Sequence, residues 1–211
     1  MASMGATLPE LHAAIEASGT ALSASVKRIP WDDRSDAAVK VTRRRTLRTN
    51  RAQRAFEAAL TLARTGVPVI EPLAWIEDGG RAWFLARFVE GRPLDVREEG
   101  EEAARLAARI HAAGVEHGDF KPQNLLVAGR RIVALDLDAA TVHGSIPSRR
   151  ARARDLGALV AYADRLGAGA RVRDRIVAAY VEQAPFEDDR ASFERAVLAR
   201  SKKKLARWAD A

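Results

Sequence analysis

The chain has 211 residues, of which 47% are hydrophobic, so it can build a medium-sized domain with a real core, and wholesale disorder is excluded. It contains no cysteine, which excludes disulfides and cysteine-ligated zinc or iron–sulfur sites and fits a reducing cytoplasm. The net charge of +7 favours anionic partners. No apolar run reaches the ~18 residues of a membrane span, and the first residues lack a signal-peptide pattern, so we expect a cytoplasmic protein.

The first ninety residues predict a sheet with one inserted helix. Short segments alternate apolar and polar residues, as strands do, and a single longer segment shows helical spacing. Breaks are expected at Gly19-Thr20, at residues 31–33, and at the hairpin turn of residues 78–80. The expected elements are three strands within residues 11–42, the third at Ala37–Val41, a helix at Thr49–Arg64, and strands at Ala74–Glu77 and Ala82–Val89.

The rest of the chain predicts a mostly helical region. Gly91-Arg92-Pro93 is a natural connection between two parts. The elements expected after it are a helix at Glu99–Ala112, a small hairpin at Leu125–Ala128 and Ile132–Leu135, and helices at 152–166, 170–183 and 190–208. The fold class is therefore α+β, with an N-terminal lobe (1–90) built on an antiparallel sheet and a C-terminal lobe (91–211) built on helices.

The segment His117-Gly118-Asp119-Phe120-Lys121-Pro122-Gln123-Asn124 carries the strongest chemical signal in the chain. It matches H-x-D-x-x-x-x-N, the spacing of the catalytic loop of kinases. In that chemistry Asp119 orients a hydroxyl and accepts its proton, and Lys121 neutralises charge on the transferring phosphoryl group. Asn124 can reach a metal ion beside the phosphates of ATP through its side-chain oxygen.

A second carboxylate follows at a fitting distance along the chain. The apolar strand Ile132–Leu135 ends directly in Asp136, which is how kinases present the carboxylate that holds Mg²⁺ between the β- and γ-phosphates. Asp138, two residues further on, is the competing ligand. We favour Asp136 because it directly ends the strand.

Two residues of the N-terminal lobe complete the expected set of charged groups. The strand Val39-Lys40-Val41 resembles the Val-Ala-Ile-Lys strand whose lysine pairs with the α- and β-phosphates. Glu57, on the helix that follows, is the expected ion-pair partner of Lys40. A solvated strand face is the alternative interpretation of Lys40 taken alone.

Nucleotide contacts are expected at two further places. Backbone groups around Arg87 and Val89 would bond the adenine edge where the last strand leaves the sheet. There is no glycine-rich G-x-G-x-x-G loop before Lys40, so the phosphate-covering turn is assigned to Gly19–Ser23, with Gly19 and Ser23 as its contacts. There is also no G-x-x-x-x-G-K-[ST] motif, which excludes a P-loop NTPase.

With these residues the chain resembles the small bacterial lipopolysaccharide kinase family (Kdo/WaaP-type), within the protein-kinase-like fold. The resemblance implies ATP and Mg²⁺ as cofactors and a hydroxyl acceptor such as a sugar of the lipopolysaccharide core. It also implies that Asp155, in Arg154-Asp155-Leu156, braces the catalytic loop through backbone amides. The alternatives are a small atypical serine/threonine protein kinase and, from another class, a pseudokinase or basic binding module.

Two basic segments suggest further partners. The arginine-rich stretch of residues 43–54 has no interleaved aromatic residues, so a solvated face is favoured and nucleic-acid binding is not expected. The C-terminal segment Phe193–Trp208 is amphipathic and basic. It either packs its apolar stripe on the C-terminal lobe or lies on an anionic membrane surface, which would place the protein peripherally at the inner face of the membrane. No pattern indicates an oligomeric state.

Overall fold

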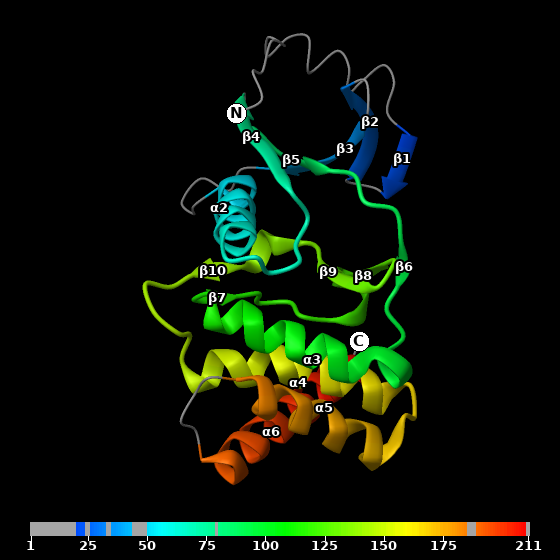
Figure 1. Cartoon of the computed structure of the whole chain (residues 1–211), viewed down its shortest axis with the longest axis vertical. Helices are drawn as coiled ribbons and strands as arrows, with labels where there is room; N and C mark the ends of the chain where they lie inside the picture. Colours follow the sequence, from blue (N-terminus) through cyan, green and yellow to red (C-terminus); the bar gives the residue numbers. More distant parts are fainter. Residues whose placement is uncertain are drawn as a thin grey trace.

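The computed structural model describes residues 20–23, 26–32, 35–43, 50–78, 80–184 and 189–209. A five-stranded antiparallel sheet forms one part of the molecule and a helical region forms the other, as Figure 1 shows. Segment 88–91 and the short strand β6 (Arg92–Pro93) connect the sheet to the first long helix of the helical region. The predicted α+β class with a kinase-like arrangement is confirmed.

The sheet has the strand order β1-β2-β3-β5-β4, in which every neighbouring pair is antiparallel. Its strands are β1 (Thr20–Ser23), β2 (Val26–Asp32), β3 (Ser35–Arg43), β4 (Pro72–Asp78) and β5 (Arg81–Arg87). Successive side chains of a strand point to opposite faces. In β3, Ala37 and Val39 therefore join a small apolar cluster on one face, whereas Ala38 and Lys40 line a pocket on the other.

Helix α2 (Arg51–Arg64) packs beside this sheet with a face made largely of alanine. Asn50 caps its first turn by accepting a hydrogen bond from the amide of Ala52. The inward residues are Ala52, Ala55, Ala58, Ala59 and Leu62. Because alanine adds so little bulk, α2 can approach both the sheet and the short turn at Leu137–Ala139.

Four helices form most of the second part: α3 (Val96–Ala112), α4 (Arg149–Arg165), α5 (Gly169–Gln183) and α6 (Arg190–Ala209). Short elements lie between these helices and the sheet, and the predicted catalytic loop lies among them (Figure 1). They are β7 (Val115–Glu116), the 3-10 turn η1 (Pro122–Asn124), β8 (Leu125–Ala128), β9 (Arg131–Ala134), the 3-10 turn η2 (Leu137–Ala139) and β10 (Thr141–Val142). One continuous apolar core runs from α2 through α3, α4 and α5 to α6.

The predicted elements of the described residues are all present, with ends that differ by a few residues. Two expected breaks differ, since Thr20 begins β1 and Trp31 and Asp32 belong to β2. Strands β1 and β2 both lie between these expected breaks, where a single strand was expected. The two-residue strands β6, β7 and β10 were not predicted, because two residues show no periodicity. No helix of the described residues is both long and apolar enough to cross a membrane.

Candidate active site

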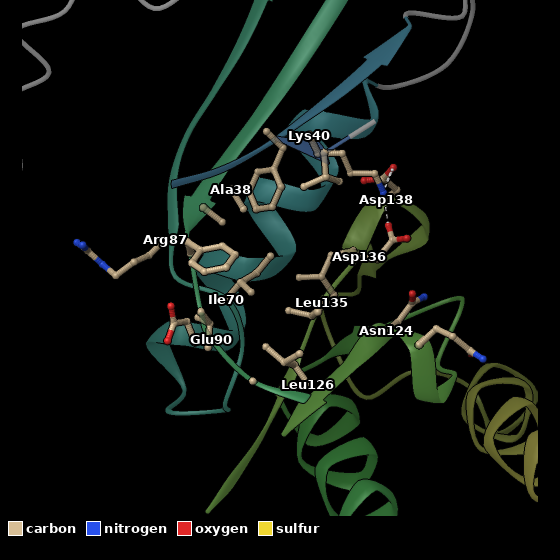
Figure 2. Close-up of a pocket in the computed structure, with 18 residues that line it drawn as sticks. Ala38, Lys40, Ile70, Arg87, Glu90, Asn124, Leu126, Leu135, Asp136 and Asp138 are labelled. Carbon is tan, nitrogen blue, oxygen red and sulfur yellow. Dashed lines mark hydrogen bonds and ion pairs between the residues drawn. The ribbon is translucent and has the colours of Figure 1, made fainter. Parts of the chain in front are cut away.

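A cavity of about 710 Å³ lies where the sheet meets the helical part. Figure 2 shows Ala38 and Lys40 on one wall and Leu126 and Asn124 on the other. In Figure 2, Asp136 and Asp138 lie at one end of the cavity, Arg87 and Glu90 lie at the other, and apolar Ile70 and Leu135 lie between them. A cavity of this size and make-up suits a nucleotide-sized ligand.

At the edge of this cavity, three residues of the predicted catalytic loop converge. The ammonium of Lys121 lies 2.5 Å from Oδ2 of Asp119. The side-chain amide of Asn124 donates to the same Oδ2 at 3.1 Å and to the backbone carbonyl of Asp119 at 2.8 Å. Asn124 is buried, and its side-chain NH2 group donates both of its hydrogen bonds to Asp119. Its side-chain oxygen can therefore accept another ligand.

The carboxylate of Asp119 is held in its charged form. Burial by itself would raise the pKa of this group, but the Lys121 ammonium and the Asn124 amide outweigh burial, and the pKa lies below its ordinary value. An ionised carboxylate can accept a proton, as a general base must.

Buried Asp155, on α4, positions the catalytic loop through its backbone. One carboxylate oxygen accepts from the amide of His117 at 2.8 Å and the other from the amide of Gly118 at 2.9 Å. His111 lies 3.2 Å away and also contacts the hydroxyl of Tyr180 at 2.8 Å. Burial opposes ionisation of Asp155, yet the His111 hydrogen bond and the loop amides lower its pKa. The expected bracing by Asp155 is confirmed.

Gly118 explains why the loop reads His-Gly-Asp. Its φ is +79°, and a Cβ placed there would lie 2.4 Å from the carbonyl oxygen of Ala139. A side chain at this position would be strained and would also push apart the catalytic loop and η2. The glycine therefore allows the loop to lie directly against the segment that carries the second carboxylate.

The buried ring of His117 links these two segments. Its Nε2 lies 3.0 Å from the carbonyl of Leu135, to which it can donate, and its ring meets Phe120 edge-on. Burial lowers the pKa of His117, which favours the neutral ring. The amide of Leu135 also donates to the carbonyl of Asn124 at 2.8 Å. The strand that ends in Asp136 is thus fastened to the catalytic loop.

Asp136 is the one non-glycine residue with positive φ among those described, at φ 51° and ψ 64°. Left-handed backbone costs energy for a residue with a side chain, and such strain gathers at functional sites. This conformation turns the chain into η2 directly after β9. Asp136 and Asp138 both reach the same cation, Lys40, as Figure 2 shows.

Lys40 bridges the sheet to this turn. Its Nζ lies 2.5 Å from Oδ1 of Asp136 and 2.9 Å from Oδ2 of Asp138. Burial disfavours the charged form of Lys40, but the two carboxylates outweigh burial and raise its pKa. Asp138 is the more buried carboxylate, with 15% of its side chain exposed, and its Oδ1 has no hydrogen-bond partner among the described residues. Burial raises the pKa of Asp138, and the Lys40 ammonium only partly offsets this rise.

The expected ion pair between Lys40 and Glu57 is absent, and this prediction was wrong. Glu57 is exposed on α2 and accepts a hydrogen bond from Gln53 at 2.8 Å. It is the only carboxylate of the helix, and it follows buried Ala55 by two residues, which is about 200° around the helix. The inward spacing of the alanines in this segment could have revealed that Glu57 faces away.

Sequence reasoning gave Asp138 too small a role, treating it only as a rival metal ligand. The structure places Oδ2 of Asp138 2.9 Å from Nζ of Lys40, a contact that was expected from the helix carboxylate. Two features of the sequence could have identified Asp138 as the partner of Lys40. The helix has no carboxylate on its inward face, and Asp138 closely follows Asp136.

The expected adenine contacts lie at the inner end of the cavity. Arg87 and Val89 both line it. The Arg87 amide already donates to the carbonyl of Glu71 at 2.9 Å, and the Phe88 amide donates to Asp36 at 2.8 Å. The Val89 backbone makes no hydrogen bond within the described part of the chain, so it is the group available to an adenine edge.

The expected phosphate-covering turn is only partly visible. Gly19 lies outside the described residues, and Ser23 belongs to β1, but its side chain is also outside the described part. The described residue of this region that reaches the cavity is Val26, at the start of β2.

The charged end of the cavity fits a magnesium ion. Mg²⁺ prefers oxygen ligands and is usually held by one or two carboxylates together with substrate phosphates. Asp136 supplies a carboxylate at the cavity surface, and Asn124 has a side-chain oxygen that is not spent on the loop. The buried Oδ1 atom of Asp138, which has no hydrogen-bond partner among the described residues, is a third oxygen in the same turn.

Two family models match the chain. The model of the lipopolysaccharide kinase (Kdo/WaaP) family matches residues 82–180, which hold the catalytic loop and Asp136. The model of the phosphotransferase enzyme family matches residues 14–116, which hold most of the sheet and α2. The resemblance to lipopolysaccharide kinases is therefore confirmed.

Individual relatives agree with these matches over part of the chain. A probable serine/threonine-protein kinase BUD32 homolog from Archaeoglobus fulgidus is 32% identical over 98 residues, which cover 46% of this chain and 49% of the relative. A probable bifunctional tRNA threonylcarbamoyladenosine biosynthesis protein from Methanosarcina acetivorans is 34% identical over 89 residues, which cover 41% of this chain and 16% of that protein. The chain thus spans about half the length of one of these relatives, and a much smaller share of the other.

A solved structure gives the fold. An aminoglycoside-3'-phosphotransferase of type VIII superposes with a TM-score of 0.51 at 15% identity, covering 86% of this chain and 90% of that one. The shared fold and the two family matches agree with the geometry of the cleft. Residues 82–180 are thus similar to the lipopolysaccharide kinase (Kdo/WaaP) family, residues 14–116 are similar to the phosphotransferase enzyme family, and the fold is shared with an aminoglycoside phosphotransferase.

Proposed function

We propose that this chain transfers the γ-phosphate of ATP to a hydroxyl acceptor, with Mg²⁺ as the metal ion. The observation that carries the proposal is the convergence of Lys40, Asn124 and Asp136 on one nucleotide-sized cavity, with Asp119 hydrogen-bonded to Asn124 beside it. Lys40 comes from the sheet, whereas the other three side chains come from one segment between α3 and α4, whose loop is held by hydrogen bonds to buried Asp155. A pseudokinase or binding module has no need for this complete set.

Each group has a distinct task. The apolar walls and the Val89 backbone bind adenine, and Lys40 neutralises the phosphates. Asp119 orients the acceptor hydroxyl and takes its proton as the oxygen bonds to the γ-phosphorus. The bond from that phosphorus to the bridging oxygen breaks, and ADP leaves. Lys121 stabilises charge on the phosphoryl group in transit. Asp136 and Asn124 would hold Mg²⁺, which would supply positive charge to neutralise the phosphates.

In this proposal the main ion-pair partner of Lys40 is Asp138 and not Asp136. Asp136 is needed for the metal ion, so it cannot also remain the main partner of Lys40. Asp138 is buried, lies 2.9 Å from the ammonium and is attached to the same turn, so it keeps Lys40 in position. Asp138 thereby replaces the helix carboxylate that α2 does not present.

Two acceptor classes have support. The match to the lipopolysaccharide kinase family favours a sugar hydroxyl, such as one of the lipopolysaccharide core. The BUD32 homolog favours a serine or threonine hydroxyl of a protein. Both use the same carboxylate base, so only the acceptor side of the cleft differs between them.

Peripheral contact with an anionic membrane surface is a further proposal, and α6 supports it. The exposed residues Lys202 and Arg207 lie on this helix. Its apolar residues Phe193 and Val197 are buried in the core, so the interpretation that the helix packs on the lobe holds for them. Membrane contact would therefore rest on charge alone.

The proposal is tested with purified protein, Mg²⁺ and radiolabelled ATP, offered a panel of lipopolysaccharide, sugars and proteins. Asp119→Asn should keep the fold and nucleotide binding but lower phosphotransfer by about 10²–10⁴-fold, the usual cost of losing a positioned base. Glu57→Gln, on the outer face of α2, is the matched control and should be active. Wild-type turnover in the Asp119→Asn variant would refute the assignment.

A further inference from the structure

The C-terminal helix brings a second ammonium to the proposed base. Nζ of Lys204, on α6, lies 3.6 Å from Oδ1 of Asp119. Lys121 occupies the other oxygen, Oδ2, at 2.5 Å. The carboxylate is therefore flanked by a cation from its own loop and by a cation from a helix more than eighty residues later in the chain. Nothing in the phosphoryl-transfer roles assigned above uses Lys204.

Lys204 is fixed in place by aromatic packing. Its ammonium lies 5.5 Å from the centroid of the Trp208 ring, one turn further along α6. Trp208 in turn meets the ring of Tyr162 on α4 edge-on at 4.8 Å, and the Arg165 guanidinium stacks over it at 5.1 Å. Only 27% of the Lys204 side chain is exposed. Such a lysine is less free to swing away than a solvated one.

The positive charge continues along the same face of α6. Arg200 precedes Lys204 by four residues, about 6 Å along the helix axis. It lies close against α4 because Gly157 has no side chain, and a Cβ there would lie 2.6 Å from Cβ of Arg200. A groove of about 340 Å³ opens between α4 and α6 at this point. Its charged lining residues are all basic: Arg149, Arg150, Arg200 and Lys203.

The hydroxyl of the acceptor has to approach Asp119, so the groups next to that hydroxyl lie beside Lys204, and Arg200 lies four residues earlier on the same face of α6. A cationic acceptor would meet like charge here, which is unfavourable, whereas an anionic one would gain charge-assisted hydrogen bonds. The neighbour of shared fold is named for aminoglycosides, which are polycations, so the two proteins should differ in acceptor charge.

We propose that Lys204 and Arg200 form an acceptor subsite for a compound that carries a carboxylate or phosphate near the hydroxyl to be phosphorylated. The inference rests on the proposed phosphotransfer and adds the charge class of the acceptor. Lys204 binds the anionic group next to the reacting hydroxyl, and Arg200 extends the subsite along α6 towards the basic groove.

Equilibrium binding tests the subsite without any turnover. The protein is saturated with MgADP, so that phosphate groups cannot enter the nucleotide site, and is titrated by calorimetry. The probes are a hexose 6-phosphate, a hexuronate, the parent hexose and an aminoglycoside. We expect one or both anionic sugars to bind at least about tenfold more tightly than the hexose, a difference of about 1.4 kcal/mol, and the aminoglycoside to bind least. Which anionic sugar is preferred tells phosphate from carboxylate.

Charge-removing variants assign the effect to residues. Lys204→Met keeps the stem of the side chain and should remove most of the preference for anionic sugars. Arg200→Met should weaken it in part. Lys202→Met, two residues from Lys204 and exposed, is the matched control and should bind like the wild type. Equal binding of the hexose and both anionic sugars, or an unchanged preference in Lys204→Met, would overturn the inference.

A pH profile separates a role beside the base from a merely structural one. The Lys204 ammonium helps to lower the pKa of Asp119, so removing it should raise that pKa. The acid limb of kcat/KM should then move to higher pH in Lys204→Met and stay in place in Arg200→Met. If no phosphotransfer is found at all, the proposed function fails, yet the binding titration still decides on the subsite. If phosphotransfer depends on Asp119 but anionic sugars gain nothing, only this inference fails.

Discussion

Lys40 should be coupled energetically to Asp138 and not to Glu57, and a double-mutant cycle can measure this. The perturbations are Lys40→Met, Asp138→Asn and the double variant. The second cycle pairs Lys40→Met with Glu57→Gln. Each replacement removes charge with little change in side-chain volume, so packing is largely kept.

The structure sets the expected size of the coupling. At 2.9 Å and an effective dielectric constant near 20, the attraction between Lys40 and Asp138 is about 6 kcal/mol before desolvation is counted. Only 21% and 15% of these two side chains are exposed, so desolvation offsets much of that gain. Asp136 still contacts Lys40 when Asp138 is replaced. We therefore expect a coupling of about 1–3 kcal/mol, as for residues in direct contact.

Urea denaturation of the protein without nucleotide provides the assay, with unfolding free energies taken from midpoints and slopes. The same cycle on kcat/KM shows whether the coupling matters for phosphotransfer. Lys40 and Glu57 should be additive within about 0.5 kcal/mol, because Glu57 bonds Gln53 on the outer face of α2. Additivity of Lys40 and Asp138, or strong coupling of Lys40 to Glu57, would refute the assignment of Asp138 as the partner.

Further predictions concern the metal site, pH dependence and the C-terminal helix. Asp136→Ala should abolish Mg²⁺-dependent ATP binding while Asp138→Ala only weakens it, and titration of MgATP would show the reverse order if Asp138 were the main ligand. His117 is buried with a lowered pKa, so its stabilising effect is present above the unfolded value near pH 6.5 and is lost as the pH falls below it. Between pH 7.5 and 5.5, His117 should lower the free energy of unfolding by at most ~1.4 kcal/mol per pH unit, so the decline should be weaker in His117→Asn. An equal decline in that variant would exclude His117 as its cause. Binding to anionic vesicles should occur at low salt and be lost in the Lys202→Glu/Arg207→Glu variant, which should still phosphorylate a soluble acceptor; binding that survives high salt would show that charge is not the cause.

The main helices and strands, and three residues of the candidate site, could be predicted from the sequence because they depend on local patterns. Strand alternation and helical spacing predicted the main elements, since each element must present one apolar face to a core. The catalytic loop was recognisable because phosphoryl transfer needs a carboxylate base and an amide oxygen at a set spacing. Asp119, Asn124 and Asp136 lie close together in sequence, so the local chain alone brings them near one another.

Tertiary structure decided the contacts between distant segments. The sequence alone suggested Glu57 as the partner of Lys40, but the alanine face of α2 turns Glu57 outward and leaves Lys40 to Asp136 and Asp138. In the sequence, Lys204 is one of several lysines of a basic helix. In the structure, Trp208 packs on Tyr162 and Lys204 lies beside Asp119. The physical reason is that helical phase and helix docking are set by packing over the whole core. A spacing pattern records which residues share a face, but it does not record which distant side chain that face will meet.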